Sequence, residues 1–124
     1  MPYKERRQYP RVPDAVPCHV TAGASSWATE TQNISCGGVL CRLREPLPAM
    51  TQLSIDLQLP KVAKEPASSM IHCVGVVVRQ EQVGEPQGTL YLTAIYFSQL
   101  ESEDRKRIAE FVLQSMLSHD RRHS

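Results

Sequence analysis

The sequence lacks long apolar runs, a strong net charge and an abundance of aromatic residues. A membrane-spanning helix needs about 20 consecutive apolar residues, so the short apolar stretches here exclude one. The formal net charge of +1 gives no argument for a nucleic-acid or membrane partner. Aromatic residues make up only 6 %, too few for the basic, aromatic groove that binds single-stranded nucleic acid. We therefore expect no DNA or RNA partner and no membrane insertion.

Signatures of export and catalysis are also missing. The N-terminus, MPYKERRQYPR, is basic but is not followed by the apolar segment of a secretory signal, so we expect a cytoplasmic protein. The chain has no G-x-S-x-G, no Walker-type glycine loop and no H-E-x-x-H. Carboxylates are scattered through loops and the predicted helix start. We therefore predict that the protein is not an enzyme.

The four cysteines lack the C-x-x-C pair that is typical of a zinc site. The alternative to reduced thiols is a zinc site made from Cys18, Cys36, Cys41 and Cys73, with His19 and His72 nearby. The two Cys-His neighbour pairs fall in strand-like segments, where adjacent residues point to opposite faces, so each pair offers one ligand. We expect small buried thiols and no bound metal.

Alternating apolar residues predict an all-β domain. Strands are expected over residues 15–21, 27–32, 39–43, 53–59, 71–80 and 89–97. Gly75 lies inside the fifth of these and indicates a bend or a bulge. The segments between them have turn or loop composition, at 23–26, 33–38, 60–69 and 84–88. Six short strands followed by one helix predict a small antiparallel β-barrel with a C-terminal helix.

The helix is predicted over residues 100–117, where the apolar period changes. It has two alternative starts: a capping box of Ser98 and Glu101, or Ser102 followed by two acidic residues. Four residues on one face are expected to pack on the barrel: Ile108, Phe111, Val112 and Ser115. Three more widen this face and are candidates for contact with a second copy: Leu113, Met116 and Leu117. Three basic residues are expected to be solvated: Arg105, Lys106 and Arg107.

Composition divides the chain into three regions. Residues 1–13 form a flexible basic arm, in which prolines at positions 2, 10 and 13 oppose a helix. Residues 14–118 form the barrel and its helix. Residues 119–124 form a tail that is expected to be frayed.

The arm carries the first of two clusters that point to a ligand. Arg7 and Arg11 form an R-x-x-x-R pattern. In an extended arm they lie roughly 13 Å apart, whereas a turn brings them around one small anion. The planar guanidinium binds phosphate oxygens or guanine O6 and N7 in bidentate fashion, and its face stacks on a base. The alternative is an ordinary solvated basic tail.

The second cluster is NISCGG at residues 33–38. Asn33 and Ser35 are two residues apart, so an extended chain presents both polar groups on the same face. The glycines allow a sharp turn and a close approach of a ligand to the backbone. The alternative is an ordinary β-turn.

Together, the two clusters resemble the PilZ domain family. The pattern is R-x-x-x-R on an N-terminal arm, followed some 20 residues later by [D/N]-x-S-x-x-G, here Asn33, Ser35 and Gly38. The segments ERRQYPRVP, NISCGGVLCRL, EPLP, VGVVVRQ and IYFSQLESEDRKRIAEFV follow the order and spacing of the family. The resemblance covers roughly residues 5–114 and implies a six-stranded antiparallel PilZ-like β-barrel.

What the resemblance implies for function is a bacterial sensor and effector module that binds the second messenger cyclic di-GMP. The ligand-binding residues carried over by position are Arg6, Arg7, Arg11, Asn33, Ser35 and Gly38. The two motif arginines clamp phosphate and guanine, the asparagine and serine hydrogen-bond the guanine edge, and the glycine keeps the backbone close. Arg6, just before the first motif arginine, implies stacking on a second ligand molecule. No cofactor besides this ligand is expected.

The arm is expected to close over the ligand and to change the surface offered to a downstream protein partner in trans. Motility and biofilm formation are among the outputs that such modules control. The alternative is a PilZ-like adaptor that binds a protein but no nucleotide; such members typically lack the arginine motif. Two positions depart from the family: Asn33 stands for the commoner aspartate, and Ala94 for the usual glycine. The protein is expected to be a monomer or a homodimer.

Overall fold

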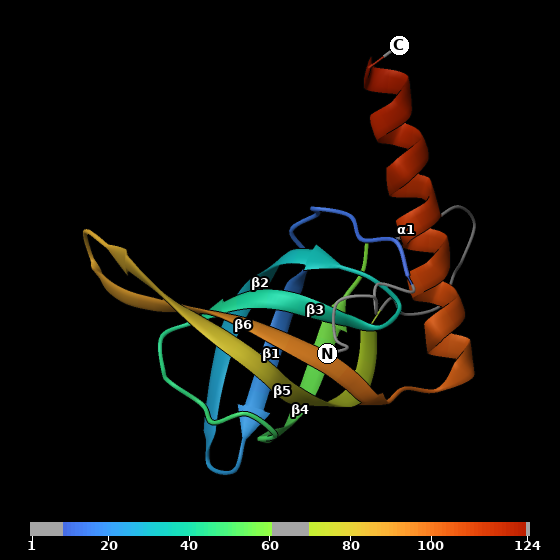
Figure 1. Ribbon diagram of the computed structural model, residues 1–124. Coiled ribbons are helices and arrows are strands. Elements are labelled where there is room, and N and C mark those ends of the chain that lie inside the picture. The colour runs from blue at the N-terminus through green and yellow to red at the C-terminus, as the bar shows by residue number, and fades with distance from the viewer. Residues whose placement is uncertain (1–8, 61–69, 124) are drawn as a thin grey trace, which may run out of the picture.

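The computed structural model of the protein describes residues 9–60 and 70–123. These residues form a closed antiparallel β-barrel followed by one long helix (Figure 1), which confirms the predicted fold class. The strands are β1 Pro17–Ala22, β2 Ser25–Ile34, β3 Gly38–Leu43, β4 Gln52–Gln58, β5 Met70–Glu85 and β6 Gly88–Gln99, and the helix is α1 Ser102–His123. Around the barrel the strand order is β1-β2-β3-β6-β5-β4, and β4 closes it by pairing with β1.

The barrel interior is filled by the inward-facing residues that the alternation predicts. In β4, Leu53, Ile55 and Leu57 are buried, whereas Ser54 between them is exposed. The same alternation gives buried Cys18 and Val20 in β1. Burying these side chains on the inner face of a curved sheet supplies most of the driving force for folding.

Strands β5 and β6 are longer than predicted and form a hairpin that projects from the barrel (Figure 1). The apolar alternation ends near Gln80, but the backbone pairing continues to the Glu85–Gly88 pair. The loop expected at 84–88 is therefore reduced to a tight turn at residues 86–87. Alternation marks burial, whereas pairing needs only backbone hydrogen bonds, so the exposed half of the hairpin left no such signal. The bulge expected at Gly75 is confirmed, because the register shifts between Val74 and Gly75.

Helix α1 begins at the second of the two predicted starts. Glu103 and Asp104 lie in its first turn. The first helical hydrogen bond runs from the Arg105 N–H to the Glu101 carbonyl at 2.9 Å, so Glu101 rather than a serine is the N-cap residue. The predicted end near residue 117 is wrong, since the helix continues to His123. Residues 118–123 contain no glycine or proline to stop it.

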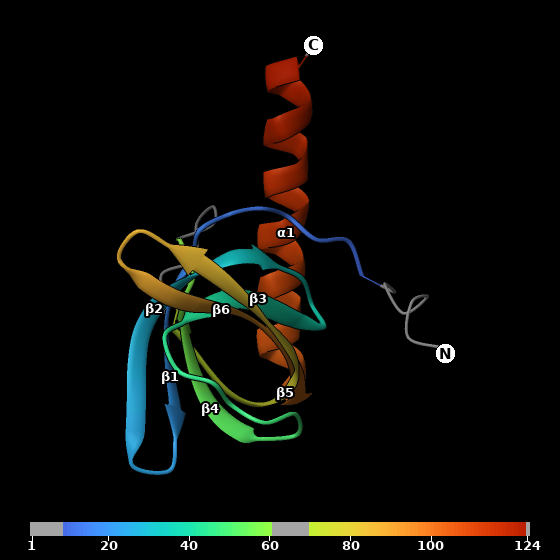
Figure 2. The ribbon, with the colours of Figure 1, turned by 60° about the vertical axis from the view of Figure 1, so that its left-hand side comes forward.

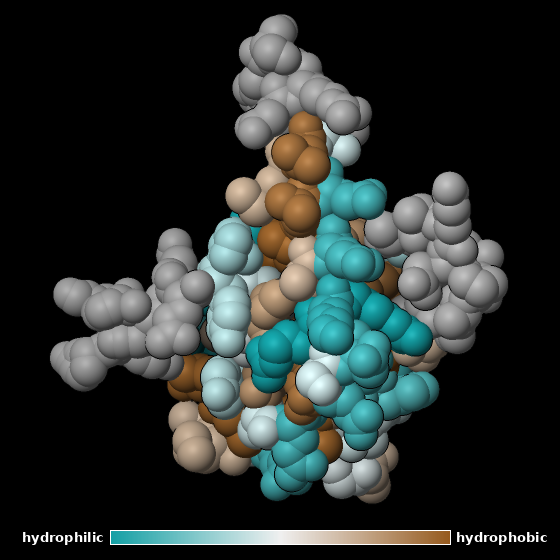
Figure 3. Space-filling view, turned by 90° about the vertical axis from the view of Figure 1, so that its right-hand side faces the viewer, coloured by the Kyte–Doolittle hydropathy of each residue, from teal (hydrophilic) through white to brown (hydrophobic). Residues whose placement is uncertain are grey.

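The helix packs on the barrel through the predicted face. Ile108, Phe111 and Val112 are buried in the core cluster. The apolar residues that widen this face are exposed, and they form a brown strip on the upper part of α1 in Figure 3: Leu113, Met116 and Leu117. No helix in the described part of the chain is long and apolar enough to span a membrane.

Candidate ligand-binding site

The two predicted clusters meet at one end of the barrel. Val12 is 3 % exposed and pairs with Ile34 through two backbone hydrogen bonds of 3.1 and 3.0 Å. The N-terminal segment thus runs across the end of the barrel beside the last residues of β2 (Figure 2). This bridge brings the end of the R-x-x-x-R motif next to the start of the N-x-S-x-x-G motif.

The chain entering the barrel is anchored just after the bridge. The buried Thr31 hydroxyl donates to the Asp14 carbonyl at 2.7 Å and accepts from the Val16 N–H at 3.0 Å. From the helix, the Ser115 hydroxyl donates to the Asp14 carboxylate at 2.6 Å. The segment that directly follows the predicted arm is therefore attached to both the barrel and α1.

Arg11 and Asn33 are in direct contact across the bridge. The Arg11 guanidinium donates to the Asn33 Oδ1 at 3.3 Å, and the arginine is exposed to solvent. An exposed cation thus stands beside an amide that both donates and accepts. A guanidinium can bind a phosphate, and an amide can hydrogen-bond the edge of a guanine. Arg6 and Arg7, the other two arginines of the predicted site, lie outside the described residues.

The segment between β2 and β3 is shorter than the predicted turn. Asn33 and Ile34 belong to β2 and pair with Leu40 and Val39, so only residues 35–37 form the turn. Ser35 is 5 % exposed, and its hydroxyl oxygen accepts from the Gly37 N–H at 3.0 Å. In this structure, the predicted ligand-binding hydroxyl therefore braces its own loop.

Gly38 is required by packing on the neighbouring strand. It pairs with Tyr96 of β6, and a Cβ at this position would lie 2.1 Å from the Ile95 carbonyl oxygen. The absence of a side chain lets β3 and β6 approach, which is a different reason for glycine than access for a ligand. Ala94 lies on the same strand pair, opposite Leu40.

Two residues of this site were not predicted from the sequence. The exposed Tyr9 ring lies over Gly37, where an added Cβ would meet its Cδ2 at 3.1 Å. From the helix, the Arg105 guanidinium donates to the Cys36 carbonyl at 2.8 Å. Tyr9 lies inside the R-x-x-x-R motif, so its position was available from the sequence, whereas Arg105 is brought here only by the docking of α1.

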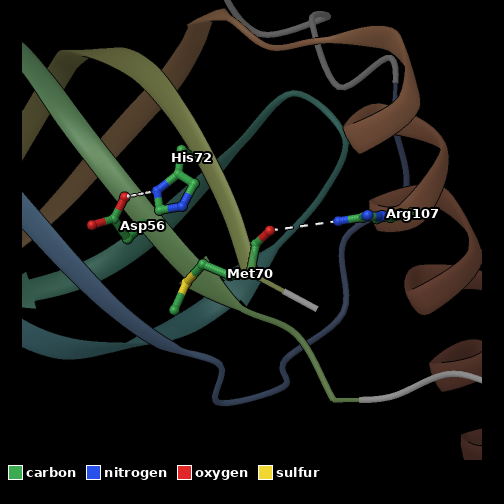
Figure 4. Close-up of polar contacts among 4 residues, drawn as sticks. All are labelled: Asp56, Met70, His72 and Arg107. Carbon is green, nitrogen blue, oxygen red and sulfur yellow. Dashed lines mark hydrogen bonds and ion pairs between the residues drawn. The ribbon is translucent and has the colours of Figure 1, made fainter. Parts of the chain in front are cut away.

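The predicted solvated face near the helix start is wrong for two of its three residues. Arg105 and Arg107 are half-buried, and only Lys106 is exposed. Arg107 donates to the Met70 carbonyl at 3.5 Å (Figure 4) and forms an ion pair with Asp104 at 3.5 Å. These arginines turn toward the barrel because Arg105 stands three residues before the buried Ile108, and Arg107 four residues before the buried Phe111, which are the spacings that share a helix face.

Figure 4 also shows a contact between His72 and Asp56. The two residues are directly opposite in β5 and β4, and their side chains are 2.5 Å apart and exposed. They lie on strands other than those that hold the two motifs. This pair is therefore not part of the candidate site.

All four cysteines are free thiols and buried. Burial raises the pKa of Cys36, and it raises the pKa of Cys73 to about 12. A hydrogen bond between Cys18 and Cys41 lowers the pKa of the first thiol and raises that of the second. Within residues 9–60 and 70–123, no group of three or more His, Cys, Asp or Glu side chains is arranged to hold a metal.

Replacing Ser35 by alanine is expected to lower the free energy of unfolding by about 1 kcal/mol, because the Gly37 N–H loses its acceptor inside the loop. Urea unfolding followed by the fluorescence of the single tryptophan, Trp27, measures this difference. Ser54→Ala, on the exposed face of β4, is the matched control and should unfold like the unmodified protein. Equal stability of the two variants would contradict the bracing role.

Comparison with known proteins assigns the family. The model of the PilZ domain matches residues 5–114, so the chain belongs to the PilZ domain family. A comparison with curated proteins finds no match.

Several solved structures share the fold. The Bacillus subtilis inhibitor of motility (MotI/DgrA) is similar with a TM-score of 0.74 and 23 % identity, over 95 % of this chain and 57 % of that one. The PilZ domain of YcgR from Escherichia coli, solved with c-di-GMP, is similar with a TM-score of 0.67 and 14 % identity, over 95 % of this chain and 97 % of that one. The MrkH–c-di-GMP complex of K. pneumonia is similar with a TM-score of 0.72 and 19 % identity, over 94 % of this chain and 54 % of that one. This chain thus spans little more than half of MotI and MrkH.

Proposed function

We propose that this protein is a receptor for cyclic di-GMP and not an enzyme. The observation that carries the proposal is the contact between Arg11 and Asn33, which joins the two family motifs at the Val12–Ile34 bridge. Family membership adds support, as do the structural neighbours YcgR and MrkH, which were solved with this ligand. The proposed ligand-binding residues are Arg6, Arg7, Arg11, Asn33, Ser35 and Gly38.

The chemistry of the ligand fits this donor set. Cyclic di-GMP carries two phosphates and two guanines, so a receptor needs cations and planar hydrogen-bonding groups in one place. Each hydrogen bond to a charged group contributes about 1.5–3 kcal/mol net. Two or three arginines therefore supply much of the roughly −8 kcal/mol of a micromolar complex. Ordering the arm offsets part of this gain.

The arm is the proposed moving part. Residues before the bridge close over the ligand while the bridge and the Asp14 contacts hold the base of the arm. The closed arm then presents a different surface to a downstream protein partner, in motility or biofilm signalling. Because the ligand is an intracellular messenger, the proposal includes a cytoplasmic location. Amide hydrogen exchange tests the closure: the arm should become protected when ligand is added, and an arm that exchanges equally fast with and without ligand would contradict it.

The direct test is calorimetric titration of cyclic di-GMP into the purified protein, with Arg7→Ala and Arg11→Ala as comparison variants. Binding to the unmodified chain that both variants lose supports the receptor. A ratio near two ligands per protomer supports stacking on Arg6. Absence of heat, together with an unchanged melting temperature, would contradict the receptor and favour the alternative, an adaptor that binds a protein partner without nucleotide.

A further inference from the structure

The turn that follows Asn33 is held by a contact with helix α1. The Arg105 guanidinium donates to the Cys36 carbonyl at 2.8 Å, and the Cys36 thiol donates to the Arg105 carbonyl at 3.8 Å. Cys36 is 9 % exposed and Arg105 is half-buried, so water competes weakly for these groups. The two residues are 69 positions apart in sequence.

This contact fixes one peptide group at both of its ends. The Cys36 carbonyl and the Gly37 N–H belong to the same planar peptide unit. Arg105 binds the carbonyl from the helix side, while the Ser35 hydroxyl accepts from the N–H within the turn. Rotation of this peptide would break both hydrogen bonds together. Arg105 and Ser35 therefore hold a single conformation of residues 35–37.

The same helix also holds the segment that follows the arm, on the other side of the Val12–Ile34 bridge. Ser115 of α1 donates to Asp14, the residue that directly follows the arm. Helix α1 thus contacts the segment after Arg11 and the segment after Asn33, which meet at the Val12–Ile34 bridge. A change in the docking of the helix acts on both segments, and by linkage a ligand that orders both segments stabilises the docked helix.

We propose that Arg105 is a positioning residue for ligand binding, which sets the conformation of residues 35–37 and couples this turn to helix α1. The proposal rests on the cyclic di-GMP receptor function proposed above. Arg105 acts through the Cys36–Gly37 peptide and not by contact with the ligand. Its side chain is directed at a backbone carbonyl, which uses the directional donors of a guanidinium and not only its charge.

The test compares Arg105→Met with Lys106→Met. Both remove one positive charge from adjacent positions of the helix, but Lys106 is exposed and makes only a 3.9 Å surface pair with Glu103. The amide NMR signals of Gly37 and Gly38 in the ligand-free protein report the turn, and titration of cyclic di-GMP reports affinity. For Arg105→Met we expect shifted signals at both glycines and about tenfold weaker binding. Lys106→Met should leave the signals and the affinity unchanged.

Glycine signals and affinity that are unchanged in Arg105→Met would overturn the proposal, as would an equal loss of affinity in Lys106→Met, because charge alone would then explain the effect. If Arg105→Met does not fold, Arg105→Lys replaces it: this variant keeps the charge, and unchanged glycine signals with full affinity would overturn the proposal. If the unmodified protein binds no cyclic di-GMP, the receptor function fails, and the glycine signals alone decide whether Arg105 positions the turn.

Discussion

Replacing Arg11 by alanine is expected to weaken the binding of cyclic di-GMP by about 10- to 100-fold, the range for losing one or two hydrogen bonds to a charged group. Of the three arginines proposed to bind the ligand, Arg11 is the one that the structure describes, and it is exposed beside Asn33. Removing it takes away the guanidinium donors that the proposed binding mode directs at a phosphate, and it removes the hydrogen bond to Asn33. Isothermal titration calorimetry with the unmodified protein and the variant measures the ratio of dissociation constants.

The matched control is Arg44→Ala, which removes the same charge from the other end of the barrel. The Arg44 guanidinium lies near Gly88, at the turn of the projecting hairpin. This variant should bind like the unmodified protein. If it loses as much affinity as Arg11→Ala, the effect is one of overall charge, and the assignment of Arg11 to the site is wrong.

The stability of Arg11→Ala should be close to that of the unmodified protein. Its contact with Asn33 is exposed, and exposed polar pairs contribute at most about 1 kcal/mol. The neighbouring attachment of the chain relies on buried Val12 and on backbone hydrogen bonds, which the substitution does not touch. A loss of affinity without a shift in melting temperature would therefore locate the effect in the ligand contacts.

Replacing Gly38 by alanine is expected to destabilise the fold by about 3 kcal/mol, the upper end for overpacking a close contact. The new Cβ would lie 2.1 Å from the Ile95 carbonyl oxygen. That oxygen belongs to the backbone of β6, so relief requires the two strands to separate rather than a side chain to rotate. Urea unfolding measures the difference in the free energy of unfolding.

Gly84→Ala provides the control for this substitution. An added Cβ at Gly84 meets nothing within 4 Å. Stability should be unchanged or rise by about 0.5 kcal/mol, because the unfolded chain loses conformational freedom. Equal stability of Gly38→Ala and the unmodified protein would contradict the packing role. A destabilised Gly38→Ala that also loses ligand would not by itself assign the glycine to ligand contact, since the strand pair beneath the turn is disturbed as well.

Local sequence patterns were sufficient for the elements and for much of the core. The strict alternation of Leu53, Ile55 and Leu57 places a strand with one buried face, and the helical spacing of Ile108 and Val112 identifies the face that packs on the barrel. Both are periodic properties of a few neighbouring residues. The family motifs likewise lie in short segments, so both their residues and the resemblance to the family could be recognised from the sequence.

The ends of strands and helices that extend beyond the core were harder to predict from the sequence. The outer half of the β5–β6 hairpin is mostly polar and is held by backbone pairing, so its sequence shows no apolar alternation. The end of α1 was placed too early because the apolar face stops before the helix does. In both cases the regular backbone structure continues beyond the residues whose side chains are buried in the core.

The strands, the packing face of the helix and the two motifs can be predicted from the sequence alone, because each depends on residues that are close together in the chain. Contacts between residues far apart in the sequence depend instead on the tertiary structure. Barrel closure and the Val12–Ile34 bridge bring Arg11 to Asn33 across 22 positions, and helix docking brings Arg105 to Cys36 across 69. Side-chain periodicity carries no information about such pairs, since a contact between distant segments depends on how whole elements pack.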